Sequence, residues 1–308
     1  MSDNRINNDE DLLSQIDKIV EKWTWERYQR IQKDLLPLID KSVEKWTWER
    51  YKRIRGKHMS YDIILDDLKE ELQNMVMCAA GGSSTQREEF DAIIPIGPAC
   101  RPAHQLKLHN LRMAAFPLDW QMDYSLDTVA HLLETEFFDF FQEVAEDEER
   151  TKNLNPGLQK NRHVTDVKNK IVSIHHFPKK LSLEEGQREF HKVMMPRAKR
   201  LIDVLKKSKR VLFVCNRSEN SEKLGEFLEE VHKIYPHGDF TLINMRDNSD
   251  MEDGEPMNIQ EMDKEYAHIR DYTFNDTNEI GGISDYWKGS IKKWHEVLKH
   301  IALKGCME

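Results

Sequence analysis

The chain has 308 residues and a formal net charge of −9, and this excess of acid argues against nucleic acid as a main partner, because phosphate binding needs a basic face. Its four cysteines lie far apart and form no Cys-x-x-Cys pair, so we expect neither a disulfide framework nor a zinc site. No apolar run approaches the roughly 18 residues of a membrane helix and the polar N-terminus resembles no targeting signal, so we expect no membrane span and a reducing, cytoplasmic location.

A near-identical repeat occupies the start of the chain, where residues 16–31 recur as residues 39–54. In each copy apolar residues return every three or four positions, as on one face of a helix, and Pro37 would break a helix running through both copies. We therefore predict that residues 1–60 form a Trp-rich helical appendage that packs on the core or self-associates through residues 16–54. The alternative is a partner-binding surface, built from Trp23, Trp25, Trp46 and Trp48.

Residues 61–85 are expected to form one further helix and then a flexible linker that contains glycine and serine. An α/β domain is expected over residues 86–308, since short apolar runs alternate there with helical patterns. The expected strands are 92–96, 170–177, 210–215 and 239–245. The expected helices are 106–110, 125–144, 190–206, 222–234 and 286–303. Wholly apolar strands between helices predict a mostly parallel sheet that flanking helices cover on both faces, preceded by the helical appendage.

Cys100 lies between the first expected strand and its helix, in the segment 97–102 with the sequence Gly-Pro-Ala-Cys-Arg-Pro. Gly97 permits a tight turn, and Pro102 suits the first turn of a helix. Cys100 is therefore expected at a helix N-terminus, where unpaired N–H groups and the neighbouring Arg101 favour a thiolate and provide donors for an oxyanion. This is the environment of a nucleophilic thiol, and the alternative is a small buried apolar residue.

A nucleophilic cysteine needs a base, and two candidates are His175 and His176 at the end of the expected strand 170–177. Adjacent strand residues point to opposite faces of a sheet, so at most one of the two histidines can face Cys100, and the sequence leaves open which. Asp119 is a candidate to orient the base. Asp166 and Asn216 are the alternatives.

The stretch 90–106, with Leu-Arg at 111–112 and Pro-Leu-Asp-Trp at 117–120, resembles a bacterial and viral domain family of unknown function whose members are described as "putative papain-like cysteine peptidases". The family pattern is a strand, Gly-x-x-Cys, Ala-x-Gln-Leu and Asp-Trp, then a strand ending in His and a Leu-Phe-Val strand. The resemblance covers roughly residues 90–245. It implies catalysis by Cys100 and a histidine near 175, and we take Arg101 and Gln105 as substrate-binding candidates. His176 stands where the family has an acidic residue, which removes one carboxylate that could orient the base.

The favoured function is a cysteine-dependent hydrolase or acyl transferase that acts on a peptide, acyl or glycan substrate and needs no metal or cofactor. The alternation of strands and helices after residue 170 does not fit the antiparallel half of papain, which motivates a second hypothesis. In a glycosyltransferase of glycan synthesis, Asn216, Arg217 and Ser218 would hold the diphosphate of a nucleotide sugar at a helix N-terminus, and Cys100 would be structural. The third hypothesis is a nonenzymatic binding module that uses the Trp-rich repeats.

Overall fold

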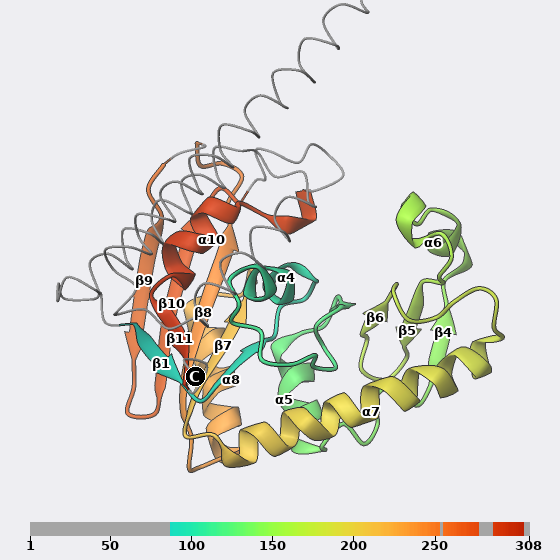
Figure 1. Ribbon diagram of the computed structural model, residues 1–308, viewed down its shortest axis with the longest axis horizontal. Coiled ribbons are helices and arrows are strands. Elements are labelled where there is room, and N and C mark those ends of the chain that lie inside the picture. The colour runs from blue at the N-terminus through green and yellow to red at the C-terminus, as the bar shows by residue number, and fades with distance from the viewer. Residues whose placement is uncertain (1–86, 253–254, 277–285, 305–308) are drawn as a thin grey trace, which may run out of the picture. The chain divides into compact units, whose positions relative to one another are not determined.

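The computed structural model describes residues 87–252, 255–276 and 286–304, which all belong to one compact unit, Thr85–Glu308. The expected Trp-rich repeat (1–60) and the expected helix and linker (61–85) lie outside the described residues. The expected α/β class is confirmed for the part of the chain that the structure describes, which combines sheets with six α-helices (Figure 1).

The main sheet has five strands, and four neighbouring ones are parallel. Its spatial order is β2 (Ala92–Pro95), β7 (Arg210–Cys215), β8 (Asp239–Asp247), β10 (Ala267–Phe274) and β9 (Asn258–Asp263). Only β9, at one edge, runs antiparallel to its neighbour. A separate parallel pair joins β1 (Glu88–Phe90) to β11 (Ile301–Leu303). The prediction of a mostly parallel sheet is therefore confirmed.

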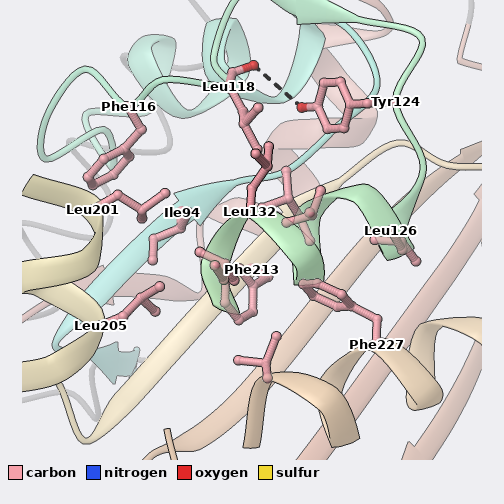
Figure 2. Close-up of a cluster of buried hydrophobic side chains, with 14 of the residues drawn as sticks. Ile94, Phe116, Leu118, Tyr124, Leu126, Leu132, Leu201, Leu205, Phe213 and Phe227 are labelled. Atoms are coloured by element: carbon pink, nitrogen blue, oxygen red, sulfur yellow. Dashed lines mark hydrogen bonds between the residues drawn. The ribbon is translucent and has the colours of Figure 1, made fainter. Parts of the chain in front are cut away.

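Both faces of the main sheet are buried at β2, β7 and β8, where successive apolar residues of a strand point to opposite sides. In β7, Val211 and Phe213 belong to one core, and Leu212 and Val214 belong to the other. The first core contains helices α5 (Leu126–Glu134), α7 (Leu183–Lys207) and α8 (Ser221–Ile234). Figure 2 shows its centre, where Ile94 and Phe213 meet side chains from all three helices. The second core contains α4 (Arg101–Leu108) and α10 (Ile291–Leu298).

A second, smaller sheet is antiparallel throughout and has the order β3 (Gln121–Met122), β6 (Val172–Ser173), β5 (Val164–Asp166) and β4 (Val144–Glu146). The short helix α6 (Glu148–Lys152) and a 3₁₀ turn (Pro156–Leu158) lie between β4 and β5. Helix α7 connects the two sheets (Figure 1). Near its start Phe190 packs against Phe141 and stacks on Phe177, and near its end Leu205 joins the core on one face of the main sheet.

The prediction of one helix over 125–144 is wrong beyond Glu134. The chain takes left-handed backbone angles at Glu136, Phe137 and Phe141, with φ of 50°, 63° and 53°, which no helix accommodates. Burial favours this route, because Phe137, Phe140 and Phe141 are fully buried in it. The carboxylate of Asp166 fixes the last turn by accepting the N–H of Phe141 at 2.7 Å.

Two other expected elements differ from the structure. The strand expected over 170–177 shrinks to the two residues of β6, which pairs antiparallel with β3 and β5 in the small sheet. The closing helix expected over 286–303 divides into a 3₁₀ turn (Tyr286–Lys288), α10 and β11, because the apolar residues 301–303 pair with β1. Strands β9 and β10 were not expected from the sequence, since charged and polar residues interrupt their apolar ones.

Candidate active site at Cys100

Cys100 is the N-cap residue of α4, at the end of β2 where the chain leaves the main sheet. The turn between them depends on Gly97, because a Cβ at this position would lie 2.4 Å from Cγ of Pro102 and 2.7 Å from Oδ1 of Asn216. The hydroxyl of Tyr124 donates a hydrogen bond to the Gly97 carbonyl. The expected place of Cys100 at a helix N-terminus is confirmed.

A cysteine is an unusual N-cap, because Ser, Thr, Asp and Asn are preferred there for their side-chain acceptors. Among the described residues the other five α-helices follow this preference, and each N-cap side chain accepts a backbone N–H of the first turn. These N-caps are Ser125, Asp147, Ser182, Asn220 and Ser290. Cys100 makes no such bond, so its presence is not explained by helix stability.

His175 lies two residues after the end of β6 and against Cys100, with Nε2 3.5 Å from Sγ. The ring of Trp120 packs edge-on against the His175 imidazole at a centroid distance of 5.8 Å. His176 faces elsewhere: its Nδ1 lies 3.3 Å from the Ser173 hydroxyl and its ring meets Phe190 at 5.8 Å. Of the two adjacent histidines, the structure therefore brings only His175 to the thiol.

Burial keeps both members of this pair neutral near pH 7. It raises the pKa of the Cys100 thiol to about 11, although the backbone N–H of the same residue favours the thiolate. Burial also lowers the pKa of His175. The resting site is thus a thiol beside a neutral imidazole, and the thiolate that the helix N-terminus led us to expect does not form at rest.

This electrostatic state predicts how Cys100 is alkylated as the pH changes. Because the thiolate is the reactive form and burial raises the pKa of Cys100 to about 11, the rate with iodoacetamide should be low at pH 7 and should rise steadily to pH 10. Peptide mass spectrometry after timed labelling measures the rate at Cys100 alone. A rate that is already maximal at pH 7 would instead indicate a thiolate–imidazolium pair.

Asp119 does not contact His175. It is buried, with 1% of its surface exposed, and its Oδ2 accepts hydrogen bonds from the Arg112 guanidinium and, at 3.0 Å, from the N–H of Phe116. Burial raises the pKa of this carboxyl although Arg112 opposes the shift. The second candidate for orienting the base, Asp166, is bonded to Phe141 and Asn169. Trp120 packs edge-on against the His175 ring, a contact that the family's Asp-Trp motif could have indicated.

Arg101 and Gln105 connect α4 to the segment before α10. The Arg101 guanidinium pairs with buried Asp276 at 2.6 Å and donates to the Trp287 carbonyl at 3.1 Å. The Gln105 amide donates to the Lys288 carbonyl at 2.7 Å. The sequence proposed both residues as substrate-binding. The structure uses their polar groups to hold the helix that carries Cys100.

The phosphate-binding candidates lie after β7, but the Arg217 side chain is only 1% exposed. Its guanidinium donates to the carbonyls of Ile96 and Tyr124, both at 3.0 Å, and pairs with Glu219 at 2.9 Å. The Ser218 carbonyl accepts a bond from Arg246, and Asn216 lies beside the Gly97 turn. These contacts stabilise the end of the sheet and give no support to the nucleotide-sugar hypothesis.

Within the described ranges, no three His, Cys, Asp or Glu side chains gather as metal ligands. Cys215 is a free cysteine like Cys100, but it is fully buried, and burial raises its pKa to about 12. Of the helices that the structure describes, none is long and apolar enough to cross a membrane.

Comparison with known proteins agrees with the site. Residues 91–244, half of the chain, match a family described as "putative papain-like cysteine peptidase". No curated protein and no solved structure matches the chain. The matched range contains both Cys100 and His175, and it ends before β9, β10 and the residues that pair with Arg101. The chain therefore belongs to this domain family of unknown function, described as "putative papain-like cysteine peptidases".

Proposed function

We propose that the protein is a cysteine-dependent acyl hydrolase or acyl transferase, with Cys100 as the nucleophile and His175 as the general base. The observation that carries this proposal is the 3.5 Å separation of Cys100 Sγ and His175 Nε2 at the N-terminus of α4. A thiol, a base within reach and a helix N-terminus are the three components that acyl transfer to sulfur requires. The family match supports the same chemistry.

The resting state determines the first step. Since burial raises the Cys100 pKa and lowers the His175 pKa, the thiol proton passes to Nε2 as sulfur attacks the substrate carbonyl, and the attack produces an imidazolium and a tetrahedral oxyanion. The imidazolium then protonates the leaving group as its bond to carbon breaks, which leaves an acyl group on Cys100. In the second step His175 takes a proton from water or from an acceptor amine, alcohol or thiol as that molecule attacks the thioester. The imidazolium then returns a proton to sulfur as the C–S bond breaks, which frees the thiol.

The oxyanion of each step would lie at the start of α4. The first N–H groups of a helix have no partner within it, and the positive end of the helix dipole favours negative charge. The backbone N–H of Cys100 favours the thiolate of its own residue, whereas Pro102, in the first turn of α4, has no N–H to donate. Trp120 would hold the His175 ring by its edge contact, in place of the carboxylate or amide that usually orients such a base.

Loss of the thiol is the direct test of this proposal. With p-nitrophenyl acetate as acyl donor, the native protein should release a burst of p-nitrophenol, and Cys100→Ala should lower the burst rate by about 10³-fold or more, since it removes the sulfur that would carry the acyl intermediate. The matched control is Cys215→Ala, which removes a buried thiol from β7 and should keep the burst. Equal bursts in native protein and Cys100→Ala would refute the proposal.

A further inference from the structure

Two arginines act on one buried carboxylate beside the proposed catalytic pair, and a third arginine lies near them. We call Arg112, Arg197 and Arg200 the arginine cluster; Asp119 pairs with Arg112, and the charge of Arg197 also acts on it. Arg112 binds Asp119 directly. The charges of Asp119, Arg112 and Arg200 all act on the guanidinium of Arg197. Arg200 donates to the Ala115 carbonyl at 3.1 Å, close in sequence to Arg112 and Asp119.

Charge and ring contacts lead from this cluster to the thiol in three steps. The Arg112 guanidinium lies over the ring of Trp120, 5.8 Å from its centroid. Trp120 meets His175 edge-on at 5.8 Å, and His175 lies 3.5 Å from Cys100. Arg197 approaches from α7, and its charge contributes to the low pKa of His176, the residue after His175. The cluster therefore borders the pair on its histidine side.

The cluster has more positive charge than its surroundings neutralise. Among the described residues Arg197 forms no ion pair, and its one hydrogen bond is a long contact of 3.9 Å to the Met194 sulfur. The lowered pKa of Arg197 has burial as its main cause, with repulsion by Arg112 and Arg200 added. Three guanidinium groups against one carboxylate leave a local charge of +2 in a chain whose formal net charge is −9. Arg200 is exposed and Arg112 pairs with Asp119, so the cost falls on half-buried Arg197. A partly buried guanidinium without a counter-ion is costly for a fold unless a ligand pairs with it.

We propose that the arginine cluster binds an anionic group of the substrate, a carboxylate or a phosphate, placed on the His175 side of the bond that Cys100 attacks. That the bound anion belongs to a substrate rests on the proposed function. The positive electrostatic potential of the cluster does not depend on the proposed function, and its effect at the Cys100 sulfur can be measured without any turnover. Guanidinium pairs recognise planar and tetrahedral oxyanions alike, so the cluster selects acidic acyl or peptide substrates over neutral ones.

Two alkylating probes of nearly the same size test this field. Iodoacetate carries a carboxylate and iodoacetamide carries an amide, and both react with the Cys100 sulfur. Arg197→Gln should lower the iodoacetate rate about fivefold, as expected for one unit charge acting through partly screened space, and should leave the iodoacetamide rate within about twofold. Arg197→Lys keeps the charge and should keep most of the iodoacetate rate. The Asp119–Arg112 pair remains intact in both variants.

The control is Lys199→Gln, which removes the same charge from the same helix at a side chain that is 77% exposed and paired with Asp203. It should change neither rate. Sodium acetate and inorganic phosphate are then compared for their protection of Cys100 against alkylation by iodoacetate. The stronger protector shows whether a carboxylate or a phosphate is the preferred anion. An iodoacetate rate that Arg197→Gln leaves unchanged, or that Lys199→Gln lowers equally, would overturn the inference. If Arg197→Gln lowers the iodoacetate rate as expected but Cys100→Ala keeps its full acyl-transfer activity, only the proposed function is refuted.

Discussion

His175→Gln is expected to lower the rate of acylation of Cys100 by about 10² to 10⁴-fold, the range that a general base contributes. The reason is the neutral resting pair. Burial holds the thiol pKa at about 11, so few molecules carry a thiolate at pH 7, and attack depends on a base that accepts the proton during the reaction. The glutamine amide nitrogen can fill the space near Sγ but has no basic lone pair.

The matched control for this variant is the same substitution one residue later. His176→Gln removes a ring that contacts Ser173 and Phe190 on the side away from the thiol, and its pKa of about 3 keeps it neutral. It should lower the thermal midpoint but leave acylation within about threefold of the native rate, since it provides no proton acceptor to the reaction. Burst kinetics with p-nitrophenyl acetate measure both variants. Equal losses in the two would contradict the assignment of His175 as the base.

Asp276→Ala is expected to have the largest effect on stability, a loss of about 3 to 5 kcal/mol in the free energy of unfolding. Asp276 is 1% exposed and accepts bonds from three groups: the Arg101 guanidinium at 2.6 Å, the Ser290 N–H at 2.7 Å and the Trp294 indole at 3.1 Å. The variant leaves the buried Arg101 charge without this counter-ion. Urea titration followed by tryptophan fluorescence measures the loss, and Asp203→Ala, in an exposed pair with Lys199, should change little.

A double variant separates the cost of breaking this pair from the value of having it. Burial raises the pKa of Asp276 to about 6 despite the attraction of Arg101, so the ionised carboxylate is itself costly to bury. Replacing both charges by apolar residues, as in Arg101→Met with Asp276→Leu, should therefore recover most of the stability lost in the single variant. A double variant as unstable as Asp276→Ala would show that the hydrogen bonds, and not the charges, hold this part of the fold.

The parts of the fold that the sequence predicted are those with a local signal. The apolar run of β7 was predicted with both of its boundaries, 210–215. The N-cap place of Cys100 followed from Gly97 and Pro102, because both residues restrict the backbone locally. The sequence predicted that only one of His175 and His176 meets the thiol; this outcome is found, but both residues lie in a bend after β6 and not on the strand from which it was argued.

The parts that the sequence did not predict depend on contacts distant in the chain. Periodicity alone cannot distinguish the turn after Glu134 from a helix, because the four closely spaced phenylalanines that follow also fit a helix. What decides the turn is their contacts with Asp166 and Phe190, which lie far along the chain. Strand β6 has two residues, which is too few for its antiparallel pairing to be recognised from the sequence. Arg112, Arg197 and Asp276 were not proposed for any role, because isolated charged residues on expected helices and loops usually face solvent.

The location of the acyl group after the first half-reaction tests the central claim most directly. The protein would be mixed with p-nitrophenyl acetate, quenched in acid within the burst and digested, and the acetylated peptides would be identified by mass spectrometry. We predict a thioester on Cys100 in the native protein and in His176→Gln, with much less in His175→Gln. Acetyl groups found only on lysines, with Cys100 unmodified in every sample, would contradict the assignment of Cys100 as the nucleophile.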